Sequence, residues 1–268
     1  MVRKLSRQGE RALSDANEIA RQGLDAQGEE RLALARRALA TSPLCARAHV
    51  LRAMEAERHS DDAIAHWRRA VSAGATAIGP AGFRDLTTGK GDGGDHAGPY
   101  IHALQGLATA LWARGVRPEA IETLQRAVRS DPEDEFVLRY TLIGWLLAVG
   151  RDHEARALLG MREPTHDKAE WNWSALLLAF RTAADTEETR TMRRETMRAN
   201  LEIPRALIRG EVPEDAWKVG TSPLDPARQP FDEAECVLES VGEAWRETPG
   251  ALDWLAAGLD ATAKDLPP

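Results

Sequence analysis

The chain has 268 residues, of which 43% are hydrophobic and 29% are charged, and its formal net charge at pH 7 is −7. This composition is typical of a globular protein and excludes a disordered chain, and the acidic balance argues against a dedicated nucleic-acid-binding protein. Two cysteines, Cys45 and Cys236, are too few for a disulfide framework or a cysteine-rich zinc site. No run of about 18 apolar residues occurs, so we expect no membrane-spanning helix. The basic start MVRKLSRQGER is not followed by an apolar segment, which argues against a secretory signal and favours a cytoplasmic protein.

Alanine-rich amphipathic segments recur along the whole chain, separated by short breaks that contain Gly, Pro, Asp or Ser. No segment shows the alternation of β-branched residues that is typical of a strand, so the sequence predicts an all-α protein. The predicted helices cover residues 6–22, 29–41, 45–58, 61–73, 99–114, 117–130, 134–149, 152–160, 168–184, 186–199, 231–247 and 249–262.

Local signals mark several helix ends. The Asp-Pro pair at 131–132 and the Thr-Pro pair at 248–249 each predict an N-cap followed by a proline at the first helical position, where no free N–H is needed. Asp185 with Glu188 resembles a capping box. Gly115 and Gly150 each follow an apolar helix, so we expect both to adopt the left-handed C-cap conformation.

An internal repeat is the strongest pattern in the sequence. Residues 101–132, IHALQGLATALWARGVRPEAIETLQRAVRSDP, fit the helix–turn–helix pattern of a tetratricopeptide repeat. In such a repeat, small residues let the two helices approach closely, a glycine closes the first helix, and a proline marks the boundary with the next unit. The positions that fit are Leu107, Ala108, Gly115, Ala120, Leu124, Ala127 and Pro132.

Neighbouring segments keep the same spacing. Residues 44–75 and the segment after 132 carry small and apolar residues at the corresponding positions, an earlier unit ends at Pro43, and residues 169–204 fit loosely. One repeat cannot bury its own faces, so several are needed for a stable array. We therefore predict a tetratricopeptide-like, right-handed α-solenoid of about four to five antiparallel helix pairs, closed by a C-terminal helical cap.

Two stretches rich in Gly and Pro interrupt the array and are predicted to be loops. The expected organisation is N-terminal helix pairs at 1–73, a Gly-rich loop at 74–98, central repeats at 99–209, a Pro/Gly-rich linker at 210–230, and a C-terminal helical pair with its tail at 231–268.

The linear order of several segments resembles bacterial tetratricopeptide-repeat proteins of the suppression-of-tumorigenicity-7-like family. These segments are IGPAGF, GPYIHALQGLATALWARG, RYTLIGWLLAVGRDHEARALL, EWNWSALLLAF, RANLEIPRALIRG and TPGALDWL, spread over about residues 30–255. The resemblance implies an α-solenoid with an interaction role and no established catalytic residues. The segment GKGDGGDHAG departs from the family pattern, so a function of that loop would be particular to this chain.

The same Gly-rich loop holds the one candidate metal site. Asp92, Asp95, His96 and His102 lie within eleven residues and offer the carboxylate and imidazole ligands that divalent metals take. The alternative is that these are solvated loop residues, with His102 on the first turn of the next helix. The glycines favour this alternative, because metal ligands are usually held rigidly.

The repeat register also predicts a partner-binding groove. Trp112 falls on the helix face that lines the concave surface of this fold, and further side chains share that surface at helical spacing. Aromatic and hydrogen-bonding groups of this kind suit a bound peptide. The alternatives are that the tryptophans pack in the core, or that the C-terminal helices fill the groove. The predicted groove residues are Arg52, Glu55, His102, Gln105, Thr109, Trp112 and Tyr140.

These observations predict a non-catalytic protein- or peptide-binding scaffold or adaptor in the cytoplasm, with no cofactor, no nucleic-acid partner and no membrane contact. Two alternatives stay open. One is a metal-dependent enzyme or accessory protein that uses the cluster Asp92, Asp95, His96 and His102. The other is a structural protein that associates with itself as a homo-oligomer. Fold alone does not decide between these functions.

Overall fold

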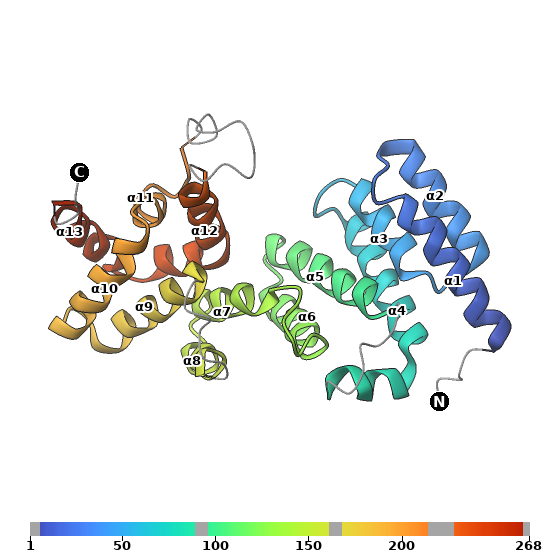
Figure 1. Ribbon diagram of the computed structural model, residues 1–268, viewed down its shortest axis with the longest axis horizontal. Coiled ribbons are helices and arrows are strands. Elements are labelled where there is room, and N and C mark those ends of the chain that lie inside the picture. The colour runs from blue at the N-terminus through green and yellow to red at the C-terminus, as the bar shows by residue number, and fades with distance from the viewer. Residues whose placement is uncertain (1–5, 89–95, 161–167, 214–227, 265–268) are drawn as a thin grey trace. The chain divides into compact units, whose positions relative to one another are not determined.

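The computed structural model of the chain describes residues 6–88, 96–160, 168–213 and 228–264 (Figure 1). Within these ranges the chain forms thirteen α-helices and no strand, which confirms the all-α prediction. The helices are α1 (Arg7–Gln22), α2 (Gly28–Thr41), α3 (Ala46–Glu55), α4 (Asp61–Thr87), α5 (Ala97–Ala113), α6 (Arg117–Arg129), α7 (Leu138–Ala148), α8 (Asp152–Gly160), α9 (Ala169–Ala183), α10 (Glu187–Ala199), α11 (Glu202–Arg209), α12 (Gln229–Glu247) and α13 (Ala251–Lys264).

The chain divides into two compact units, Met1–Leu138 and Arg139–Pro268. In the first unit each helix from α1 to α6 packs against the next one along the chain, and α1, α3 and α5 also pack against one another in sequence. The buried face at the start of this unit consists mostly of alanine with a few larger side chains, so the helices approach closely. Its buried residues are Leu13, Ala16, Ala20, Ala35, Ala38, Cys45, Ala48 and Leu51.

Helix α4 corrects the prediction of a loop over 74–98, because residues 74–87 are helical and α5 already begins at Ala97. Gly74 is a packing residue: a Cβ there would lie 3.0 Å from the Cβ of Tyr100 on α5. The backbone departs from helical geometry only at Gly79, where φ is 66°. Pro80 follows it and starts the last turns of α4, where a missing N–H costs nothing. The prediction of a loop was therefore wrong because Gly74 serves close helix packing and Gly79 serves a kink within the helix.

Apart from the helices at 61–73 and 134–149, every predicted helix has a counterpart whose ends lie within about three residues. Helix α7 begins only at Leu138, so the prediction of Pro132 as its first residue is wrong. The carboxylate of Asp131 instead accepts hydrogen bonds from the backbone N–H groups of Glu135 (3.0 Å) and Phe136 (2.9 Å), and therefore stabilises a turn that precedes the helix. The C-cap prediction is confirmed, since Gly115 and Gly150 have φ of 74° and 73°.

The second unit contains a helix that the sequence analysis missed. Helix α11 starts two residues before Pro204, a position at which proline is tolerated because first-turn N–H groups have no intrahelical partner. It packs against α12 and α13, while α12 also contacts α9. Consecutive helices such as α8 and α9, or α9 and α10, also pack together in the second unit, but α12 and α13 add contacts to α9, α10 and α11.

Arg181 connects four helices of the second unit from a largely buried position on α9. Its guanidinium donates hydrogen bonds to the carbonyl groups of Leu147 (2.8 Å) and Ala244 (3.2 Å) and pairs with Asp152 at 2.7 Å. It also donates to the hydroxyl of Thr248 at 2.6 Å. This role of Thr248 corrects the prediction that it caps the last helix, because α13 begins at Ala251 and the Thr248 hydroxyl faces back to α12.

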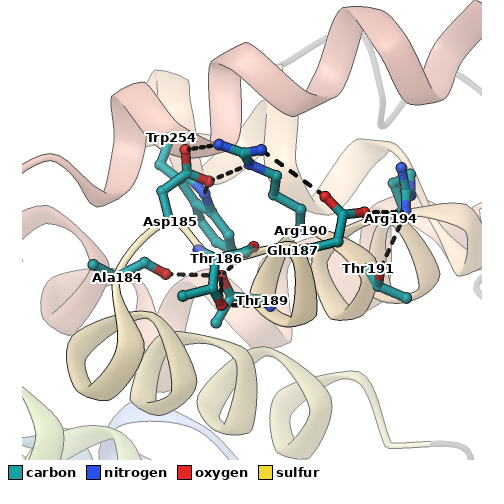
Figure 2. Close-up of polar contacts among 9 residues, drawn as sticks. All are labelled: Ala184, Asp185, Thr186, Glu187, Thr189, Arg190, Thr191, Arg194 and Trp254. Carbon is teal, nitrogen blue, oxygen red and sulfur yellow. Dashed lines mark hydrogen bonds and ion pairs between the residues drawn. The ribbon is translucent and has the colours of Figure 1, made fainter.

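Figure 2 shows the polar contacts at the turn between α9 and α10. The capping box there consists of Thr186 and Thr189, not of Asp185 and Glu188 as the sequence predicted. The Asp185 carboxylate instead accepts two hydrogen bonds from Arg190 (2.8 and 2.7 Å) and one from the indole N–H of Trp254 on α13 (2.8 Å). The hydrogen bonds from Arg190 and then from Trp254 lower the pKa of Asp185. This contact connects the start of α10 to α13.

Helices α7 and α12 approach each other at Gly144. A Cβ atom at this position would overlap the backbone carbonyl oxygen of Ser240, which a side-chain rotation cannot move away. Close helix packing of this kind requires glycine, since any side chain would separate the two backbones.

We predict that Gly144→Ala lowers the free energy of unfolding by about 3 kcal/mol, because α7 and α12 must separate to accommodate the methyl group. Urea denaturation followed by circular dichroism measures this change. Gly160→Ala is the matched control: a Cβ there meets no atom within 4 Å, so its stability should stay within about 1 kcal/mol of wild type. Equal stability of the two variants would contradict the packing argument.

Candidate functional site

A cleft of about 580 Å³ opens in the first unit between α3, the start of α4, and α5. This volume lies within the usual range of ligand-binding pockets, about 300–1,000 Å³. The apolar part of its lining is dominated by Met54 and Trp67. The polar side chains that line it are Arg58, His59, His102, Gln105 and Thr109.

Trp67 is held in the cleft by a close contact between α4 and α5. A Cβ on Gly106 would lie 2.5 Å from Cη2 of the indole, so the ring occupies the space that any larger residue at 106 would fill. The same ring lies 6.0 Å from the His102 imidazole, with an interplanar angle of 50°. Since Trp67 is only half-buried, its remaining face is available to a ligand.

His59 reaches the cleft from the turn between α3 and α4, where its φ of 62° places the backbone in the left-handed region. This conformation costs a residue with a side chain about 1–2 kcal/mol. Arg114, after the end of α5, helps to hold the turn: its guanidinium donates to the His59 carbonyl at 3.2 Å and pairs with Asp61 at 3.0 Å. Ser60 caps α4 by accepting a hydrogen bond from the N–H of Ala63 at 3.1 Å.

We predict that His59→Gly raises the free energy of unfolding by up to about 1 kcal/mol, because glycine adopts positive φ without strain. Thermal unfolding measures the change. His153→Gly is the opposite control, since His153 lies exposed in the helical backbone of α8 and its replacement should cost about 0.5–1 kcal/mol. A loss of stability in both variants would show that the turn stores no strain.

Three histidines of the first unit are poor bases, and one of them, His102, lines the cleft. Burial, followed by the nearby charge of Arg47, lowers the pKa of His102. Burial also lowers the pKa of His66, and it lowers that of His49 to about 4. The Nδ1 atom of His49 is buried without a hydrogen-bond partner among the described residues. These imidazoles are therefore neutral at pH 7. In each of them one ring nitrogen can donate a hydrogen bond and the other can accept one.

This shift predicts that the protein loses stability as the pH falls from about 6.5 to 4, because the unfolded chain binds the His49 proton at a higher pH than the folded chain. The loss attributable to His49 should approach about 3 kcal/mol at the low end of this window. Urea denaturation at several pH values measures it, and His49→Gln should reduce the pH dependence. The exposed His153→Gln should leave it unchanged, and equal pH dependence of both variants would contradict the assignment.

The structure brings three of the seven predicted groove residues together in the cleft, namely His102, Gln105 and Thr109. They share one face of α5 because their spacing follows the helical period. Trp112 does not line the cleft: it is half-buried, and the guanidinium carbon of Arg117 lies 3.7 Å from its ring centroid.

The other predicted groove residues also have different surroundings. Glu55 pairs with Arg31 at 2.8 Å inside the first unit, and Arg52 lies close enough to His49 and His66 to lower the pKa of both. Neither Arg52 nor Glu55 lines the cleft. Tyr140 belongs to the second unit, where its ring packs edge-on against Trp171 at 6.3 Å.

The other nine lining residues were not predicted from the sequence, and the four with side chains larger than alanine are Met54, Arg58, His59 and Trp67. Trp67 falls at one of the apolar repeat positions of residues 44–75, which predicts a packing role for it, and the turn at 58–59 carries no periodic signal. The contact between Gly106 and Trp67 joins two different helices, so no local pattern in the sequence marks it.

The predicted metal cluster is only partly described. Asp92 and Asp95 lie outside the described residues. His96 precedes α5, and its Nδ1 lies 3.4 Å from the Asn17 amide nitrogen, whereas His102 lies in the cleft. Across the described ranges, no three His, Cys, Asp or Glu side chains are grouped closely enough to hold a metal ion. In the same ranges no helix combines the length and the apolar character needed to cross a membrane.

Comparison of the chain with protein-family models, with curated proteins and with solved structures finds no match. The resemblance to the suppression-of-tumorigenicity-7-like family therefore stays a prediction from the sequence motifs, and the site must be interpreted from its own chemistry.

Proposed function

We propose that this chain is a non-catalytic scaffold or adaptor that binds a protein or peptide segment in the cleft of its first unit. Each helix from α1 to α6 packs against the next, and α3 also contacts both α1 and α5. This arrangement supports a tetratricopeptide-like right-handed solenoid for this unit. Such stacked helix pairs present extended surfaces to partner chains. The family resemblance implies the same interaction role.

The observation that carries the proposal is the pairing of an apolar wall with a row of hydrogen-bonding groups in one cleft. Trp67 is half-buried and Met54 is 41% exposed, so both offer apolar surface to a ligand. His102, Gln105 and Thr109 stand along α5 beside them. Peptides bind such sites with one or two apolar anchors inserted and with polar groups fixing their position.

Selection from a random peptide display library tests this proposal with wild type and two tryptophan variants. Thr109→Trp places a large ring in the cleft from an exposed position on α5, so enrichment of the selected peptides should fall at least about tenfold. Thr76→Trp is the matched control, because Thr76 is exposed on α4 of the same unit and does not line the cleft. It should bind like wild type.

Both variants should keep the helical content of wild type, since each change lies at an exposed position. Peptides that bind wild type and Thr109→Trp equally would contradict recognition in this cleft. Failure of the library to yield any enriched sequence would have the same meaning.

A further inference from the structure

The described lining of the cleft contains a cation and no carboxylate, although the whole chain is acidic. Arg58 is this cation, and the lining also holds two histidines that can donate hydrogen bonds but neither Asp nor Glu, whereas the chain as a whole has a net charge of −7. Arg58 is exposed and makes no hydrogen bond or ion pair with any described residue. Its guanidinium is therefore available to an anionic ligand, and its planar donors match the geometry of a carboxylate.

The carboxylates near the cleft do not cancel this charge. Asp61 is paired with Arg114 at 3.0 Å, and Glu55 is paired with Arg31 at 2.8 Å. Glu57 precedes Arg58 in the chain and is exposed, but it does not line the cleft.

A second cation, outside the lining, lies close enough to influence one lining residue. Burial is the main cause of the lowered pKa of His102, and the charge of Arg47, on α3, lowers it further. The guanidinium of Arg58 therefore favours negative charge in a ligand, and the exposed apolar surface of Trp67 and Met54 lies in the same cleft.

Resting on the proposed function, we infer that the ligand is an acidic segment of a partner protein. An apolar side chain such as Leu, Met or Phe packs against Trp67, and Asp or Glu side chains that flank it pair with Arg58 and accept hydrogen bonds from the imidazoles. A cleft of about 580 Å³ accommodates one such anchor with its neighbours rather than a folded surface. A nucleic acid would need a continuous row of Lys and Arg, and the lining offers a single arginine.

Fluorescence anisotropy with the full chain tests the sign of the charge. The probes are three pools of short labelled peptides with Leu, Met or Phe at the centre, flanked on both sides by Asp and Glu, by Asn and Gln, or by Lys and Arg. The acidic pool should bind about tenfold more tightly than the amide pool, and this advantage should shrink as the salt concentration rises from about 50 to 300 mM. The basic pool should bind most weakly.

Arg58→Gln should abolish the preference for the acidic pool over the amide pool while leaving the helical content unchanged. Arg37→Gln is the matched control, because Arg37 is exposed on α2 and does not line the cleft. It should keep the full preference. An equal loss in both variants would indicate that the effect comes from net charge rather than from Arg58.

The outcomes separate this inference from the proposed function. Equal binding of the acidic and amide pools, both blocked by Thr109→Trp, would overturn the acidic ligand and leave peptide recognition in place. Binding of every pool that Thr109→Trp does not affect would overturn both. No binding of the acidic pool at about 1 mM would overturn the inference alone, because a ligand weaker than this contributes little at cellular concentrations.

Discussion

Close approach between helices at very small residues is the constraint on which the rest of this structure depends. Alanine dominates the buried face at the start of the first unit. Glycine occupies the positions where a helix backbone contacts another backbone or an aromatic ring. Gly144 accommodates the Ser240 carbonyl in the second unit, and Gly106 accommodates the Trp67 indole in the first. Alanine and glycine bury little area themselves, so stability comes from the larger side chains that short distances bring into contact.

The same constraint creates the candidate site. Because Gly106 has no side chain, the Trp67 ring lies against α5 beside the His102 imidazole and stays only half-buried. The adjacent turn adds His59, which Arg114 holds in a strained backbone conformation. Strained residues often persist where the surrounding structure uses them for binding. A site of this kind is assembled by packing, so it needs no sequence motif.

Arginine has two different roles in this chain. Arg181 is largely buried and satisfied by acceptors on α7, α8 and α12, so removing it would leave several buried polar groups unpaired. Arg58 is exposed and makes no ion pair within the described ranges. Net charge therefore says little about which ligand a cleft prefers, because the local field depends on which charged side chains line the cleft and which are paired elsewhere.

The sequence by itself determined the all-α class, most helix ends, the C-caps at Gly115 and Gly150, and the shared face of His102, Gln105 and Thr109. Each of these follows from local periodicity or local backbone preference. Only the tertiary structure decided that α4 continues through residues 74–87, that Trp67 rather than Trp112 lines the cleft, and that Arg58 lies beside it. Those outcomes depend on which side chain from another helix covers a given residue: Tyr100 packs against Gly74, and Arg117 packs against Trp112. Local periodicity carries no information about such partners.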